Sequence, residues 1–559
     1  MASTKPCINA LNLCCHELPL SIAKMINEIL QKMSQIISVS SVSVHILEFL
    51  SALARLPNLY SNFTSDMYKP VFAIALNYLQ YSHTVTQSQS ATSTPTKPQQ
   101  HQSAMAQYVL IMAYLVITIW FTAMPLRERR KHVPFIIQRL LGGNPLGRPI
   151  DEQTFTCIDM LSRFSFSDIS LSPTKSLVSK VLIGETSGTK NSRTWVYGHT
   201  LLTLKTAKVI GWVEVTIRRP SGTFSMMCNI ENKIKTDQVD YKTLPALLMM
   251  QYPFAIRSEV EERRGLMIKE IMSDPQNSAH PGNNIRKADQ LLDPGLLYLQ
   301  LYNYPDITRL VEAPPPLPDD DATLRTLATL DRIPVVDFHK IGVLYVGPGQ
   351  NHEVEILANT IGSPDYIKFL HGLGTIERLR GNTGNTGGLD REMDIDGRHA
   401  YFWKDDVTEM IFHVATMMPT NLERDPQCSA KKRHIGNDYV SIVYNDSGAD
   451  YAFNTLPGQF NFVNIVVSPH SISTETMATQ ALWGAENSFF RVELQRRPDM
   501  PDIGPITEPK LISAHSLPGF VRQVALHANI FAQVQSGANG KREYVAHWRE
   551  RLRHIRRVR

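Results

Sequence analysis

An uncharged, strongly apolar run at residues 108–126 restricts what this chain can fold into more than any other stretch. It has about the length of a membrane-spanning helix, and the charged, mostly basic residues 127–131 follow it directly. The alternative is a helix that is buried on all sides among other helices. Because Tyr114, Thr118 and Pro125 dilute the run and ordinary amphipathic patterns surround it, the buried helix is favoured over a membrane anchor.

The segments around this run predict a helical region over residues 1–148. Leu, Ile, Met and Ala recur there at helical spacing. A tract of Ser, Thr, Gln and Pro at residues 82–102 cannot bury a core, and we expect it to be a flexible loop.

The length of 559 residues predicts about three domains rather than one core. A net charge of +5 is too small to imply a nucleic-acid partner. The six cysteines are scattered without a CxxC pair, which favours neither a zinc site nor a disulfide framework and is typical of a reducing, cytosolic compartment. The N-terminus has no apolar segment behind a basic start, so no signal peptide is expected.

Residues 149–312 are predicted to form a mixed α/β region. A helix is expected at 155–166, followed by β-rich segments at 194–206 and 211–232. The second segment has the pattern of a hairpin that turns at residues 220–222. A Pro/Asp-rich stretch at 313–325 then predicts a stiff linker and a domain boundary.

Residues 326–515 are predicted to be an α/β domain with a central sheet flanked by helices. Apolar runs at 339–347 and 458–469 have the pattern of strands buried on both faces. The glycine turn at 347–351 lacks a nucleotide-binding consensus, so a tight strand-to-helix turn is favoured. The glycine-rich residues 381–388 predict a flexible surface loop. Residues 401–420 are expected to supply a strand end and an amphipathic helix that carries His413 in the core; no metal site is predicted.

The stretch KKRHIGNDYVSIVYND, residues 431–446, combines a short basic segment with a β-branched strand pattern at 439–444. The first half suits a helix to residue 438, on which Arg433 and Asn437 share a face. A carboxamide carries a donor and an acceptor together, so such a surface can position a small polar group.

This stretch resembles the catalytic segment of the Rap/Ran-type GTPase-activating family. In that family one asparagine, the asparagine thumb, enters the active site of a small GTPase, and the resemblance places it at Asn437. Surrounding positions are expected to contact the GTPase or support the segment: Lys431, Lys432, Arg433, His434, Asp438 and Asn445. For Asn445, within a good turn sequence, a structural role is favoured.

The resemblance also implies an architecture and partners. It implies the end of a HEAT-like α-solenoid, an association region that makes a homodimer, and the activator domain. The expected partners are a Rheb-like GTPase and a hamartin-like subunit, with restraint of growth (TOR) signalling as the output. The chain would not be an enzyme in its own right and would need no cofactor, because GTP and magnesium belong to the GTPase. It would be cytoplasmic or peripheral on a lysosomal or vacuolar membrane.

Alternatives remain open at this point. A catalytically silent scaffold could have the same fold. The C-terminal residues 541–559 form a basic amphipathic pattern that can bind calmodulin or an anionic membrane. Residues 516–559 are expected to form C-terminal helices with a basic tail. A tail helix that packs on a domain through its apolar stripe is favoured over that binding role.

Overall fold

The structure is a computed structural model. It describes residues 4–36, 42–89, 97–142, 150–168, 192–206, 212–229, 316–470, 488–501, 503–539 and 544–558, without the side chains of 81–102. The chain divides into two compact units. Unit 1 comprises Met1–Ile169 and Val336–Val545, and unit 2 comprises Ser170–Val335 and Ala546–Arg559.

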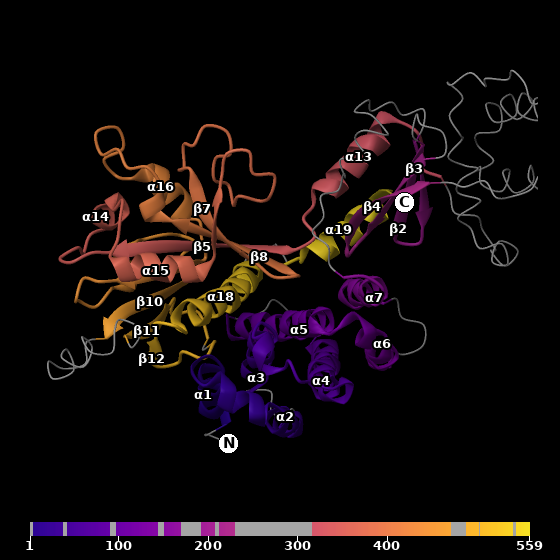
Figure 1. Ribbon diagram of the computed structural model, residues 1–559, viewed down its shortest axis with the longest axis horizontal. Helices are drawn as coiled ribbons and strands as arrows, with labels where there is room; N and C mark the ends of the chain where they lie inside the picture. Colours follow the sequence, from indigo (N-terminus) through magenta and orange to yellow (C-terminus); the bar gives the residue numbers. More distant parts are fainter. Residues whose placement is uncertain are drawn as a thin grey trace, which may run out of the picture. The chain divides into compact units, whose positions relative to one another are not determined.

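The first part of unit 1 is helical, as predicted (Figure 1). Its helices are α1 (Thr4–Glu17), α2 (Pro19–Gln35), α3 (Ser43–Ala54), α4 (Ser65–Gln89), α5 (Lys97–Ala123), α6 (Leu126–Leu141) and α7 (Glu152–Phe164). Neighbouring helices pack on one another, with α4 against α2, α5 and α6 and with α3 against α5. The packing does not establish HEAT-like repeats, which stay a prediction.

The apolar run forms most of α5. Its segment Ser103–Ala123 is long and apolar enough to cross a membrane, but 61% of its most apolar window is buried within the structure. It packs on α3, α4, α7 and α18 (Leu517–Asn539). Trp120 is fully buried, and its indole nitrogen donates a 2.9 Å hydrogen bond to Leu50 O. The prediction of a buried helix therefore agrees with the packing observed.

The predicted flexible loop at 82–102 is largely wrong. Helix α4 continues to Gln89, and α5 begins at Lys97. Pro98 is tolerated there because a helix needs no amide hydrogen bond in its first turn. Helices nucleated by apolar neighbours thus extend into the polar tract. Residues 90–96 lie outside the described part of the chain.

The second part of unit 1 is built on an eight-stranded sheet of order β12-β11-β10-β9-β5-β8-β7-β6. The strands are β5 (Asp337–Val346), β6 (Thr375–Arg378), β7 (His399–Lys404), β8 (Thr408–Val414), β9 (Val440–Asn445), β10 (Val463–His470), β11 (Phe489–Arg496) and β12 (Lys510–Ser513). The central strands β10, β9, β5 and β8 are parallel, and the outer strands are antiparallel. The predicted strands at 339–347, 439–444 and 458–469 correspond to β5, β9 and β10.

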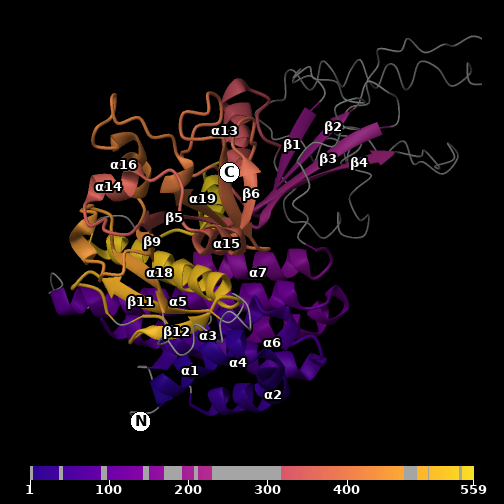
Figure 2. The same cartoon turned by 60° about the vertical axis from the view of Figure 1, so that its left-hand side comes forward.

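Helices cover both faces of this sheet, as the parallel core requires. On one face Leu344 and Val346 pack with α14 (Glu353–Ala358) and α16 (Ser429–Ile435). On the other face the ring of Tyr345 lies against Tyr366 of α15 (Pro364–Leu373). Figures 1 and 2 show α18 between the sheet and α5, and α18 contacts both.

The helix predicted within residues 401–420 is wrong. The chain there forms the antiparallel pair β7 and β8, followed by a short 3-10 turn at Ala415–Met417. Ile411 and Val414 lie on a strand that pairs with β5 on one side and β7 on the other, and Met418 follows the 3-10 turn. Burial on both faces removes the alternation that would have marked it as a strand. His413 consequently lies on β8.

In the residues that the structure describes, unit 2 is an antiparallel four-stranded sheet with two helices. Its elements are β1 (Ser192–Tyr197), β2 (Thr200–Thr206), β3 (Trp212–Arg219), β4 (Gly222–Asn229), α13 (Asp321–Arg332) and α19 (His547–Val558). The predicted hairpin is confirmed, because Arg219 pairs with Gly222 across a turn at Pro220 and Ser221. The predicted helix at 155–166 is α7, which belongs to unit 1.

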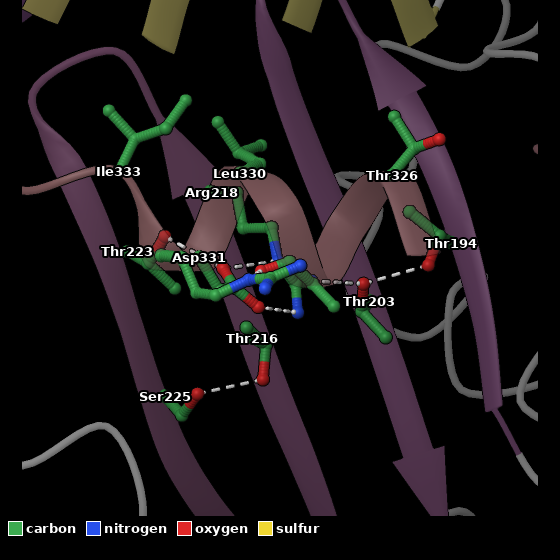
Figure 3. A network of polar contacts seen from close by, with 12 residues as sticks. Thr194, Thr203, Thr216, Arg218, Thr223, Ser225, Thr326, Leu330, Asp331 and Ile333 are labelled. Carbon is green, nitrogen blue, oxygen red and sulfur yellow. Dashed lines mark hydrogen bonds and ion pairs between the residues drawn. The ribbon is translucent and has the colours of Figure 1, made fainter. Parts of the chain in front are cut away.

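A polar network fixes α13 across this sheet (Figure 3). Asp331 accepts two 2.8 Å hydrogen bonds from Arg218, whose third nitrogen donates to Thr203 Oγ1 at 2.7 Å. The predicted linker at 313–325 therefore ends inside a helix of unit 2, and the two units divide between Val335 and Val336.

The C-terminal basic helix α19 is packed in unit 2. Leu552 and Ile555 are buried, and Ile555 contacts the cluster formed with Leu327 and Leu330 of α13. The packed helix that the sequence favoured is thus confirmed. Binding of calmodulin or a membrane through the same apolar stripe would require α19 to leave this position.

Candidate functional site

The stretch that carries the family resemblance, residues 431–446, folds as a short helix, a turn and a strand. Helix α16 ends at Ile435, Gly436 follows, and β9 begins at Val440. The helix is therefore shorter than predicted, since Asn437 and Asp438 lie on the turn after it. The Asn437 amide donates to His434 O at 3.1 Å, which continues the last helical turn. Asn437 thus lies at the amino end of a central parallel strand, where it projects from a rigid support.

Asn437 is exposed on this turn. Its side-chain Nδ2 donates a 2.7 Å hydrogen bond to Arg433 O, the carbonyl four residues earlier. This bond holds the carboxamide near the end of α16 and still leaves the side chain at the surface. The site residue that carries the resemblance is therefore accessible to a partner.

Asp438 is buried directly beneath the turn. Its Oδ2 lies 2.7 Å from Nδ1 of His413 on β8, and both side chains are almost completely buried. Lys340 Nζ lies 4.0 Å from the other carboxylate oxygen. The absence of a side chain at Gly342 makes room for this packing, because a Cβ there would lie 3.1 Å from Ile435 Cγ2. Asp438 thus braces the turn against the sheet, and His413 is a core histidine, as expected.

Arg433 and His434 share a second buried carboxylate. Asp396 Oδ1 lies 2.9 Å from Arg433 Nη2 and 2.9 Å from His434 Nε2. Burial is the main cause that lowers the pKa of His434, with its hydrogen bond to Asp396 acting in the opposite direction. Arg433 is exposed but anchored, so its guanidinium is held beside the Asn437 turn rather than extended into solvent.

The predicted basic edge is only partly present. Lys431 is buried, and its Nζ donates a 3.1 Å hydrogen bond to Asn359 O. Burial lowers the pKa of this ammonium to about 8. Lys432 is half-exposed and lies 2.7 Å from Glu353 Oε1. Lys431 is therefore a buried support rather than a surface contact, because its side chain is turned toward Asn359, at the end of α14.

Asn445 has the structural environment that the sequence favoured. It is buried at the carboxyl end of β9, and its Nδ2 donates to Ala449 O at 2.7 Å. Its Oδ1 accepts hydrogen bonds from the amide and hydroxyl of Ser447 at 3.2 and 2.7 Å. Asn445 closes the turn after β9, at the opposite end of that strand from Asn437.

The two glycine-rich stretches, residues 347–351 and 381–388, are held in place by side chains of their own residues. After β5, the Gly347 amide donates to Gln350 Oε1 at 2.8 Å, as suits a tight turn. In the 381–388 loop Thr386 is buried, and Gly387 has φ +66°. A Cβ at Gly387 would lie 2.8 Å from His413 Nε2. The prediction of a flexible loop is therefore wrong at its carboxyl end, which packs over the histidine.

Sequence reasoning missed Asp396 and did not pair His413 with Asp438. Asp396 lies 37 residues before Arg433, and His413 lies 25 residues before Asp438. No spacing rule links such positions, because the crossover between strands brings them together. Within the described ranges, no three His, Cys, Asp or Glu side chains gather in a way that could hold a metal ion.

Comparison with known proteins gives matches across the chain. Residues 356–557, which include Asn437, match the sequence model described as Rap/ran-GAP, and residues 1–88 match the one described as Tuberin. The Tuberous sclerosis 2 protein homolog of Schizosaccharomyces pombe is 38% identical over 555 residues, covering 99% of this chain and 37% of that protein. The Ral GTPase-activating protein subunit alpha-1 of Homo sapiens is 33% identical over 213 residues, covering 38% of this chain and 10% of that protein.

A solved structure described as that of the TSC2 GAP domain is 52% identical and covers 36% of this chain and 100% of its own, with a TM-score of 0.33. The chain spans little more than a third of the length of its yeast relative and about a tenth of the human one. By these matches the chain is a relative of tuberin, and its residues 356–557 belong to the Rap/ran-GAP family.

Proposed function

We propose that this chain is a GTPase-activating protein that inserts Asn437 into the active site of a Ras-like small GTPase. The observation that carries the proposal is the exposed carboxamide on a turn that buried side chains brace from below. The match of residues 356–557 to the Rap/ran-GAP family supports it.

The chemistry needs little more than a positioned carboxamide. Hydrolysis of the γ-phosphate depends mainly on orienting water and offsetting developing charge. The carboxamide of Asn437 can accept a hydrogen bond from the attacking water while it donates one to a phosphate oxygen. To do so, its Nδ2 must exchange the bond to Arg433 O for one to the partner. The GTPase supplies the nucleotide and magnesium, so this chain contributes one catalytic residue in trans.

The braced turn supports the catalytic role over a scaffold role. A side chain that only contacts a partner tolerates small displacements, whereas a catalytic group must be held in place before the encounter. Asp438 and Asp396 fix the residues on both sides of Asn437. We assign Arg433 and His434 to support and edge contact, and no arginine finger is invoked.

The proposed partner is a Rheb-like GTPase. The similarity to the Tuberous sclerosis 2 protein homolog supports this assignment, and the same similarity supports a hamartin-like subunit and an output in growth (TOR) signalling. The Ral GTPase-activating protein subunit alpha-1 relatives make a Ral-type GTPase the second candidate. A panel of small GTPases distinguishes the two.

The test is GTP hydrolysis by purified Rheb-like, Ral-like and Rap-like GTPases, with the wild-type chain or with Asn437→Ala. We expect the wild type to accelerate one GTPase strongly and the variant to lose about 100-fold or more of that acceleration, the usual loss for a group that stabilises transition-state charge. Asn58→Ala, which removes an exposed carboxamide from the helical part of the chain, is the matched control and should change turnover little. Full activity of Asn437→Ala would refute the role of this residue, and no acceleration by a folded wild type would favour the scaffold.

A further inference from the structure

The loop at residues 390–397 presents two bare apolar side chains beside the Asn437 turn. Met393 and Ile395 are 73% and 63% exposed, among the most exposed large apolar side chains of the described residues. An exposed apolar residue alone needs no explanation. Two of them on one short loop next to a candidate catalytic residue do, because contact surfaces gather apolar side chains at their centres.

Hydrogen bonds to the side chain of Asp390 hold the loop backbone. The Asp390 carboxylate accepts hydrogen bonds from the amides of Glu392, Met393 and Ile395 at 3.1, 2.8 and 3.0 Å. The Asp390 amide in turn donates to Asp396 Oδ2 at 2.8 Å. The two apolar side chains therefore project from a fixed backbone, which lowers the entropy lost when a partner covers them.

Asp396 joins this loop to the catalytic turn. Its Oδ2 accepts from the loop, and its Oδ1 lies 2.9 Å from both Arg433 and His434. The Arg433 carbonyl accepts the hydrogen bond from Asn437 Nδ2. The chain of contacts is short and buried at its centre, since Asp396 is only 5% exposed. Met393 and Ile395 therefore lie within three residues of the carboxylate that anchors the Asn437 turn.

We propose that Met393 and Ile395 contact an apolar patch of the small GTPase, beside the nucleotide pocket that Asn437 enters. This inference rests on the proposed function and adds binding residues to the same site. Asn437 supplies the chemistry, whereas the two apolar side chains supply affinity by leaving water on binding. Asp396 is the positioning residue that keeps both parts in register.

The experiment uses the double variant Met393→Ser/Ile395→Ser in the full chain, with whichever GTPase the wild type accelerates. Initial rates at varied GTPase concentration give KM and kcat separately. The matched control is Leu511→Ser, which removes a 47% exposed leucine from β12, at the other edge of the sheet. Thermal melting of all chains checks the fold, which these exposed substitutions should not alter.

We expect the double variant to raise KM about 10-fold or more with kcat within a factor of about two, because truncating buried interface side chains removes binding in ground and transition states alike. The control should match the wild type. An unchanged KM, or a fall in kcat alone, overturns the proposal. A change in self-association by sedimentation with unchanged KM also overturns it and assigns the loop to contact between copies of this chain. If the wild type accelerates no GTPase, the proposed function fails instead.

Discussion

At the scale of single residues, Asn437 and Asp438 are chain neighbours with opposite surroundings. Asn437 is exposed, whereas Asp438 is 1% exposed and bonded to His413. A buried carboxylate needs such partners, because an unpaired charge in the interior is costly. Because of this cost, Asp438 is held in a well-defined position. The buried Asp438 in turn fixes the position of its exposed neighbour Asn437.

Replacing Asp438 should therefore impair turnover more than binding. Asp438→Asn keeps the shape of the side chain but removes the charge that faces His413 and Lys340. We expect kcat for activation to fall about 10-fold, with KM changed less than about twofold, because a small displacement of a catalytic group costs rate. Varied-concentration kinetics provide the measurement. A rise in KM at constant kcat would show that Asp438 supports binding instead.

At the scale of elements, one buried carboxyl joins three segments of unit 1. Glu48 on α3 is 1% exposed. It accepts hydrogen bonds from the Tyr108 hydroxyl of α5 at 2.9 Å and from the Gly504 amide at 3.0 Å. Burial raises the pKa of Glu48 from 4.5 to about 7, with the two hydrogen bonds acting in the opposite direction. The helices and the sheet region thus share a group that titrates near neutrality.

The sign of the pH dependence follows from this raised pKa. Between about pH 4.5 and pH 7 the folded state holds a proton on Glu48 that the unfolded state has released, so stability falls as pH rises. The total change is about 3 kcal/mol. Glu48→Gln removes this titration. We expect the melting temperature of the variant to exceed that of wild type at pH 8, with the difference shrinking or reversing at pH 5. Parallel curves for both proteins would contradict the assignment.

At the scale of the whole molecule, the chain leaves unit 2 at Val335, builds the eight-stranded sheet in unit 1, and returns to unit 2 with α19. Arg551 holds α19 in unit 2. This guanidinium is fully buried and donates to the carbonyls of Leu330, Ile333 and Arg219 and to the hydroxyl of Thr223. The last helix is therefore part of the fold of unit 2 rather than a free tail.

Loss of this arginine should loosen unit 2. Arg551→Ala leaves several buried carbonyls without donors, which should destabilise unit 2 by about 3 kcal/mol or more. We expect faster amide hydrogen exchange in β3 and β4, while the strands of unit 1 stay protected. Arg557→Ala, at an exposed position of the same helix, is the control. Equal exchange in both variants would show that Arg551 does not hold the unit together.

How much the sequence determined can be seen from particular elements. Apolar runs and turn chemistry were enough for β5, β9, β10, the β3–β4 hairpin and the buried helix α5, because these signals are local. The resemblance placed Asn437, which the structure shows to be exposed on a turn. Periodicity failed at β8, where burial on both faces leaves no alternation.

Only the tertiary structure decided what surrounds Asn437. The pairing of Asp438 with His413, the bridge from Asp396 to Arg433 and His434, and the burial of Lys431 all join positions that lie in different elements. Sequence spacing constrains side chains within one helix or strand, where the backbone geometry is fixed. It does not constrain pairs that meet only after the strands have been ordered in a sheet. The sequence determined that residue 437 is an asparagine, and the packing of distant elements determined where its side chain lies.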